Sequence, residues 1–305
     1  MESLLYNHNR LIVKILLFFV VPFFGITLNY AQQKLLFTVA PASIDQRNFV
    51  EKNKIESISM LYQQYFVVND RLDESKLEDA IVKLFPGVNQ SGYAVIDWEG
   101  KGLDAIYMKN SNDKSAFNFY LKQFSQAISL AKRLRPNVKW SIYKLPVAFY
   151  KNDKAEMVTK NLLPLLGKLD FLCPSIYPKF LNPQEGKENL PSYRENVINS
   201  LRYGKMLNKP VYPFVWHRIS PGKAKYPDRL LSINQFSSEI EYILGLTYQG
   251  VKPSGIVWWN SEQFEFGKRK KQGKIGSDLA NVEGSRMSQS DFFQSYFNSI
   301  SKFFK

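Results

Sequence analysis

Short apolar runs of strand length recur along this 305-residue chain, with amphipathic stretches between them. A run of this kind bounded by turn residues is typical of a buried β-strand. Because strands alternate with helices, the order predicts successive βα units and a parallel sheet. The predicted strands are residues Leu35–Ala40, Ile58–Tyr62, Tyr93–Trp98, Trp140–Leu145, Phe171–Tyr177, Pro210–Trp216 and Gly255–Trp259.

The stretches between these runs carry apolar residues at helical spacing. The clearest begins at the capping pair Asn112-Asp113 and ends before Pro136. The other predicted helices cover residues 75–84, 196–206 and 234–246, and an amphipathic helix over 292–303 docks on the body. Seven such units favour an α/β fold, a distorted TIM-like (β/α) barrel. An open doubly wound sheet is the alternative, because counting strands does not establish closure.

Two carboxylates stand at the carboxyl end of the third predicted strand, Asp97 within it and Glu99 just after it. Side chains at positions i and i+2 of a strand point to the same face, so these two project together, roughly 6–7 Å apart. Like charges this close raise the pKa of one group, which makes it a candidate general acid. A salt-bridged pair at a strand end is the structural alternative.

In a barrel, active-site residues lie at the carboxyl ends of the strands. Tyr62, Tyr177, Trp216, His217 and Trp259 all occupy such positions. Each could simply pack at the rim. Several aromatic rings around a carboxylate pair, however, favour a sugar-binding cleft, since apolar sugar faces stack on aromatic rings.

The amino end predicts export. Arg10 and Lys14 precede an apolar run over residues 15–26, and Ala31 offers a small residue for cleavage. We therefore expect residues 1–31 to be a signal peptide and residues 32–305 to form one domain. An uncleaved anchor is the alternative. Because Cys173 is the single cysteine, no intramolecular disulfide is possible, which fits a bacterial envelope or medium. We therefore expect the protein to be either secreted or located in the periplasm or cell envelope.

The charge balance, 41 basic against 27 acidic residues, predicts a polyanionic partner unless the excess is ordinary surface lysine. The densest group of basic residues is the run at residues 268–271. The only histidines are His8 and His217, which argues against a histidine metal cluster. The chain also lacks a G-x-S-x-G elbow, a P-loop and a dinucleotide fingerprint. We expect no metal and no cofactor, which leaves carboxylates and tyrosines as the reactive groups.

Several of these segments resemble the hyaluronidases, family 56 of the glycoside hydrolases. The matches follow the family's order over roughly residues 55–262, and the stretch around Asp97 and the Pro-Ser-Ile-Tyr stretch are the most specific. They are Ile58–Tyr62, Val95–Glu99, Leu134–Pro136 followed by Trp140–Tyr143, Pro174–Tyr177, Pro210–Phe214 and Gly255–Ser261.

The resemblance implies a barrel of about seven strands that cleaves a β-linked N-acetylhexosamine polymer internally. Glu99 would donate the proton to the leaving oxygen. Asp97 would hold and polarise the substrate's own acetamido group, whose oxygen is the nucleophile, an exception to the two-carboxylate scheme. Tyr177 would orient that group, Trp259 would line the pocket for its methyl, and Tyr62 would border the same subsite.

The chain also departs from the family. Gly100-Lys101-Gly102 stands where a Trp-Arg-Pro stretch is usual, the animal cysteines are absent, and Trp216-His217-Arg218 replaces a tyrosine followed by Thr-Arg. Because of these differences, the resemblance does not specify which polymer the chain would cleave. Arg218 and the run at residues 268–271 are expected to contact substrate carboxylates.

The leading hypothesis is an exported glycoside hydrolase whose partner is an acidic polysaccharide such as hyaluronan or chondroitin. We expect neither nucleic-acid binding nor stable membrane insertion after signal removal. A chitinase-like or peptidoglycan hydrolase, a non-catalytic glycan-binding protein on the same barrel, and a lyase using tyrosine and His217 are the alternatives.

Overall fold

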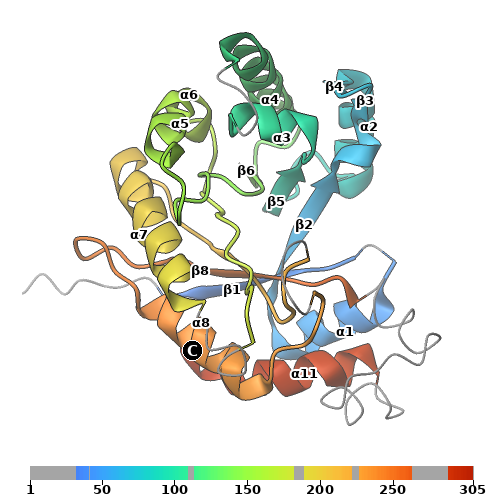
Figure 1. Cartoon of the computed structure of the whole chain (residues 1–305). Coiled ribbons are helices and arrows are strands. Elements are labelled where there is room, and N and C mark those ends of the chain that lie inside the picture. The colour runs from blue at the N-terminus through green and yellow to red at the C-terminus, as the bar shows by residue number, and fades with distance from the viewer. Residues whose placement is uncertain are drawn as a thin grey trace, which may run out of the picture. The chain divides into compact units, whose positions relative to one another are not determined.

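The computed structural model describes residues 32–40, 42–108, 113–181, 189–221, 227–262 and 288–304. They belong to one unit, residues 32–305 (Figure 1). The predicted signal peptide and the basic run at residues 268–271 lie outside the described residues.

Six parallel strands form the central sheet, in the order β6-β5-β2-β1-β8-β7. This arrangement confirms the predicted α/β fold and its parallel sheet. The strands are β1 (Lys34–Thr38), β2 (Glu56–Tyr62), β5 (Gly92–Asp97), β6 (Val138–Ile142), β7 (Phe214–Trp216) and β8 (Gly255–Trp259). A small hairpin of β3 (Val67–Val68) and β4 (Arg71–Leu72) was not predicted.

The predicted strand at residues 171–177 is wrong as a regular strand, and the next one is shortened to β7. Pro174 interrupts the first segment and Pro213 the second. Proline has no N–H to donate, so Pro174 leaves a gap in the ladder between the two segments. Backbone hydrogen bonds on either side of the gap join them, and the pairing appears as isolated bridges at Leu172–Val211 and Ser175–Phe214.

The irregular segment is also bonded to the other edge of the sheet. The backbone N–H of Asp170 donates to the Trp140 carbonyl, and that of Cys173 donates to the Leu145 carbonyl, both at 2.9 Å. Residues 170–176 therefore lie between the edge strands β6 and β7, the place that the missing seventh strand would occupy.

Helices connect the strands. The predicted helices are found as α2 (Glu74–Leu84), α4 (Lys114–Leu134), a longer α7 (Leu190–Leu207) and α8 (Ile233–Gly245). Asp113 caps α4 as expected, accepting hydrogen bonds from the N–H groups of Ser115 and Ala116. Elements without a sequence prediction are α1 (Ile44–Asn53), η1 (Gln63–Tyr65), α3 (Lys101–Ile106), α5 (Ala155–Asn161) and α6 (Leu163–Leu166). The end of the helix predicted over 292–303 is the 3-10 helix η2 (Ser301–Phe304).

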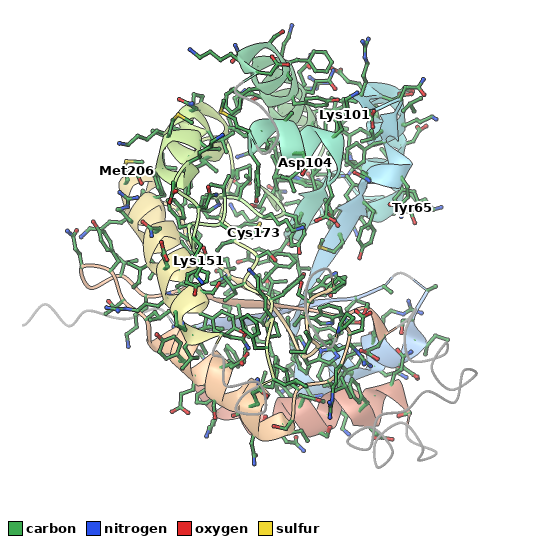
Figure 2. The ribbon with its side chains drawn as sticks, in the orientation of Figure 1. Tyr65, Lys101, Asp104, Lys151, Cys173 and Met206 are labelled. Carbon is green, nitrogen blue, oxygen red and sulfur yellow. The ribbon has the colours of Figure 1, made fainter. Side chains whose placement is uncertain are left out.

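The two faces of the sheet have separate cores. One face packs against the helices and holds most of the apolar side chains. The other face forms a smaller cluster without any helical residue, as in the interior of a barrel. Cys173 belongs to this inner cluster and is a buried free thiol (Figure 2). The inner cluster also contains Leu36, Ile58, Val95, Phe171, Phe214 and Val257.

The predicted C-terminal helix is α11 (Gln289–Ile300), which packs against α1 and α8 (Figure 1). Its buried residues include Phe292, Phe293 and Tyr296, so the expected docking on the body is confirmed. Just beyond it, Gln32 Nε2 donates a hydrogen bond of 2.6 Å to the Phe304 carbonyl. Among the helices that the structure describes, none combines the length and the apolar character needed to cross a membrane.

The start of β8 requires glycine. Gly255 has φ of 148° and pairs with Lys34 of β1. A Cβ atom at this position would lie 1.9 Å from the Lys34 carbonyl oxygen. Glycine is therefore the residue that allows β1 and β8 to approach each other here.

Candidate active site

Asp97 and Glu99 lie together at the carboxyl end of β5. The strand register places Asp97 beside Tyr62, the last residue of β2. Trp98 points the other way, into the helical layer, with its ring centroid 4.6 Å from that of Phe124 in α4. Lys144 pairs with Glu99, and the charges of both Glu99 and Lys144 act on Asp97, so the two carboxylates lie near each other. This is the alternation expected of a strand.

Asp97 is an unusual carboxyl group. Burial and the neighbouring Glu99 charge raise the pKa of Asp97 to about 7, while the charge of Lys144 opposes this rise. The Oδ1 atom is buried and has no hydrogen-bond partner among the described residues. A buried acceptor without a donor is costly, so a ligand that brings an N–H group here is stabilised.

Glu99 is more exposed and is already paired. Its carboxylate contacts Nζ of Lys144, which follows β6, and the two side chains are 43% and 34% exposed. Tyr107 donates its hydroxyl hydrogen to the Lys144 carbonyl. Gly100, with φ of 65°, then turns the chain into α3. Glu99 can therefore be reached by a ligand, but only in competition with Lys144.

Aromatic rings surround the carboxylates. Tyr177 stacks on Trp259, with the ring centroids 5.4 Å apart and an interplanar angle of 22°. Trp216 contacts both rings, at centroid distances of 5.6 and 4.8 Å. The ring centroid of Tyr143 lies 6.2 Å from that of Tyr177. Tyr177 and Trp259 are partly exposed, so the apolar face of a sugar can stack against them.

Tyr62 completes this group on the β2 side. It lines a pocket with Thr38, Met60 and Asn260, at the carboxyl ends of β1, β2 and β8. Tyr62, Tyr177, Trp216 and Trp259, all predicted as site residues, are thus gathered near Asp97, whose charge acts on Tyr62 and Tyr177.

The tyrosines of the cleft are protonated at neutral pH. Burial raises the pKa of Tyr62 to about 12, against a hydrogen bond with Trp259 that lowers it. Burial also raises the pKa values of Tyr143 and Tyr177 well above the ordinary range. These phenols therefore act as hydrogen-bond donors rather than as bases, which weighs against a tyrosine-based lyase.

No family model matches the chain. It does match two solved structures of bee venom hyaluronidase, one of them in complex with a hyaluronic acid tetramer. Both matches have a TM-score of 0.60 and 16% identity, and cover 87% of this chain and 97% and 96% of the bee venom chains. The chain shares the fold of bee venom hyaluronidase. The expected TIM-barrel-like architecture is thereby confirmed.

His217 and Arg218 do not join the cleft. Trp216 faces the aromatic group, and the next side chain, His217, points toward the helices, where its ring lies 5.4 Å from that of Phe292. Both side chains are fully buried. The predicted contact between Arg218 and a substrate carboxylate is wrong in this structure, because its guanidinium is enclosed and pairs with the Glu262 carboxylate.

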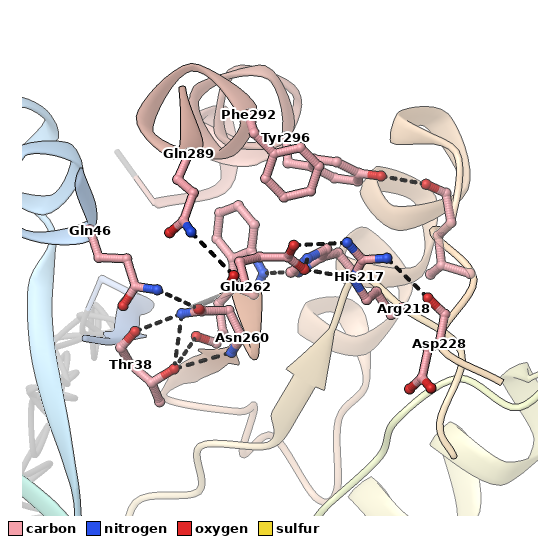
Figure 3. A network of polar contacts seen from close by, with 12 residues as sticks. Thr38, Gln46, His217, Arg218, Asp228, Asn260, Glu262, Gln289, Phe292 and Tyr296 are labelled. Atoms are coloured by element: carbon pink, nitrogen blue, oxygen red, sulfur yellow. Dashed lines mark hydrogen bonds and ion pairs between the residues drawn. The ribbon is translucent and has the colours of Figure 1, made fainter. Parts of the chain in front are cut away.

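These residues form a buried polar network around Glu262 (Figure 3). Arg218 Nη2 and His217 Nε2 contact its two carboxylate oxygens at 2.8 and 2.9 Å. Trp258 Nε1 donates to His217 Nδ1. Burial would raise the pKa of Glu262, but hydrogen bonds from Arg218 and His217 bring it to about 2. Burial lowers the pKa of His217, so a neutral ring is favoured. This network is structural.

Two residues of the site escaped the sequence analysis. Lys144 pairs with Glu99, and Tyr143 lies beside Tyr177 with its hydroxyl 3.2 Å from Ser175 Oγ. Both stand at the end of the predicted strand Trp140–Leu145, so the carboxyl-end rule applied to every strand would have found them. Within the described ranges, no three His, Cys, Asp or Glu side chains gather as a metal site.

Proposed function

We propose that this protein is an exported glycoside hydrolase that cleaves β-linked N-acetylhexosamine bonds in an acidic polysaccharide of the hyaluronan or chondroitin type. The observation that carries the proposal is the placement of Asp97 and Glu99 on one side of the carboxyl end of β5, beside the stacked rings of Tyr177 and Trp259. The fold of bee venom hyaluronidase, which has been crystallised with a hyaluronic acid tetramer, supports it.

The reaction uses the substrate's own acetamido group. Asp97, as a carboxylate, accepts the acetamido N–H, and the acetamido oxygen attacks the anomeric carbon. Glu99 gives a proton to the leaving oxygen as the glycosidic bond breaks. Water then opens the cyclic intermediate, and Glu99 takes a proton from that water. The chain is left in its starting state, and one water molecule has been consumed.

The surrounding side chains have positioning roles in this scheme. Tyr177 is a protonated phenol and donates to the acetamido oxygen. Trp259 and Trp216 form the apolar wall against which the acetamido methyl packs. Tyr62 borders the same subsite from β2, next to Asp97. Holding the nucleophile within reach of the anomeric carbon supplies the larger share of such a rate enhancement.

A non-catalytic glycan-binding protein is the second candidate. The observation in its favour is the ion pair between Lys144 and Glu99, which engages the side chain that a hydrolase needs as its proton donor. Such a protein would keep the aromatic cleft and its affinity for sugar without the proton donor.

Product analysis by mass spectrometry separates the two candidates. The mature protein and Glu99→Gln are incubated with hyaluronan, chondroitin, chitin oligomers and peptidoglycan. We expect saturated oligosaccharides from an acidic polymer, and about a 10²–10⁴-fold lower rate for Glu99→Gln, the range that general acid catalysis contributes. Unsaturated uronate products would indicate a lyase instead.

Glu56→Gln is the matched control, because Glu56 also pairs with a lysine, Lys34, but at the amino end of β2. It should leave the rate unchanged. If no polymer is cleaved, while both the mature protein and Glu99→Gln bind one of them equally, the glycan-binding candidate replaces the hydrolase.

Export is part of the proposal. We expect the protein to be recovered from the envelope or the medium with an amino terminus at about Gln32, after removal of residues 1–31. Amino-terminal sequencing of the recovered protein checks this. A terminus at Met1 would contradict cleavage and favour an uncleaved anchor.

A further inference from the structure

The ion pair between Lys144 and Glu99 conflicts with the role of Glu99 in the proposed function. A general acid must carry a proton when it meets the glycosidic oxygen. In the free protein, Lys144 Nζ instead contacts Oε1 of Glu99, so the ammonium competes with the glycosidic oxygen for this side chain. Catalysis requires that the substrate releases it.

The backbone of Lys144 is fixed, whereas its ammonium is accessible. Lys144 has φ of 65°, a region that lysine rarely adopts, and Tyr107 donates a hydrogen bond to its carbonyl. Its Nζ lies 5.1 Å from the centre of the Tyr143 ring, and 34% of the side chain is exposed. A ligand anion can therefore reach the ammonium without a movement of the main chain.

We propose that Lys144 makes cleavage depend on an anionic sugar, because its ammonium leaves Glu99 for the carboxylate of a uronate in the bound polymer. This inference rests on the proposed function and adds a specificity-determining residue to it. The exchange replaces one carboxylate acceptor by another, so one charge-assisted hydrogen bond is kept. Glu99 can then meet the glycosidic oxygen, and the proton that it passes to the leaving oxygen comes from solvent.

The position of Lys144 suits this role better than that of the cations expected from the sequence. Arg218 is fully buried against Glu262, and the run at residues 268–271 lies outside the described residues. Lys144, by contrast, acts on both carboxylates, since it pairs with Glu99 and its charge lowers the pKa of Asp97. A neutral polymer of the chitin type offers no acceptor for its ammonium, so Glu99 stays paired.

The test compares hyaluronan oligosaccharides with the same oligosaccharides after methyl esterification of their uronates. Esterification removes the charge and keeps the linkage. We expect the wild-type kcat/KM to be about 10- to 100-fold higher on the acid than on the ester, the size of one charge-assisted hydrogen bond. Most of the difference should appear in kcat, because the exchange frees the proton donor. Lys144→Met should lose most of this ratio, and Lys144→Arg should retain it.

Lys101→Met is the matched control. Lys101 is an exposed lysine of α3 that pairs with Asp70, so the variant removes the same charge close to the site (Figure 2). It should leave the ratio unchanged. Equal wild-type rates on acid and ester, or a ratio that a folded Lys144→Met does not reduce, would overturn the inference and leave the hydrolase standing.

Failure of the proposed function gives a different result, since the wild-type protein then cleaves neither substrate. The comparison of acid with ester uses the unmodified chain, so the inference stays testable even if Lys144→Met does not fold.

Discussion

Asp97 shows how a single carboxyl group couples the site to stability. Its pKa is raised from 3.8 to about 7, mainly by burial and also by Glu99, against the opposing charge of Lys144. Below about pH 4 the group is protonated in both the folded and the unfolded chain. As pH rises to about 7, the unfolded chain ionises while the folded protein does not, so the free energy of unfolding falls. Above pH 7 this loss is complete.

Asp97→Asn removes this loss because asparagine does not ionise. We expect the variant to be more stable than the wild type by about 2–4 kcal/mol at pH 8, with the gain disappearing at pH 4. Urea unfolding at the two pH values measures the difference. Asp79→Asn, at an exposed position of α2, is the control. A gain of equal size at both pH values would show that burial does not shift the titration of Asp97.

The sequence could predict the carboxylate pair but not its cation. Asp97 and Glu99 share a side because of the two-residue period of a strand, which is a local property. The contact between Lys144 and Glu99 joins the ends of two different strands, and Lys144 has a positive φ, which no residue type in that stretch indicates. The prediction that His217 lines the site was wrong, although strand alternation could have corrected it. Adjacent residues of a strand point to opposite faces, so if Trp216 faces the site, His217 faces the helices.

At the scale of single elements, β1 and β8 depend on Gly255. Alanine at this position would drive its Cβ into the Lys34 backbone and would also occupy an unfavourable φ of 148°. We expect Gly255→Ala to lower the free energy of unfolding by more than about 2 kcal/mol. Denaturant unfolding with far-UV circular dichroism measures this.

Gly245→Ala is the matched control for that substitution. Gly245 is the last residue of α8, and nothing lies within 4 Å of a Cβ atom added there. Alanine favours the helix, so this variant should be as stable as the wild type or slightly more stable, by up to about 1 kcal/mol. Equal losses in both variants would contradict the close approach of β1 and β8.

Regular elements could be predicted where local signals agree. Asp113 and Pro136 bracket α4, and its apolar residues repeat at helical spacing. The run at residues 171–177 is just as apolar, but its own Pro174 cannot donate to the segment at residues 210–214, so the run pairs only in isolated bridges. Apolar runs thus indicated the position of each segment in the sheet, and prolines decided its regularity.

At the scale of the whole molecule, Glu262 joins segments that are far apart in sequence. Its side chain holds Arg218 and His217 after β7, and its carbonyl accepts a hydrogen bond from Gln289 of α11. Removal of one partner from a buried ion pair leaves a charge without compensation. We expect Glu262→Ala to cost about 3–5 kcal/mol and to loosen the docking of α11, which hydrogen exchange of α11 would report.

Glu156→Ala provides the comparison for that prediction. Glu156 pairs with Arg202 at the surface, and the two side chains are 42% and 35% exposed. Surface pairs contribute less than about 1 kcal/mol. Losses of similar size in the two variants would show that the network around Glu262 does not support the fold.

The hydrogen bond between Gln32 and the Phe304 carbonyl has a practical consequence for engineering. Because the two ends of the described body are adjacent, a linker of a few residues can join them without crossing the sheet. New termini can then be opened between Asn69 and Asp70, in the exposed turn of the β3–β4 hairpin. The result is a circular permutant that keeps every strand of the central sheet. A second domain can be fused to its new termini, which lie in the hairpin that follows η1.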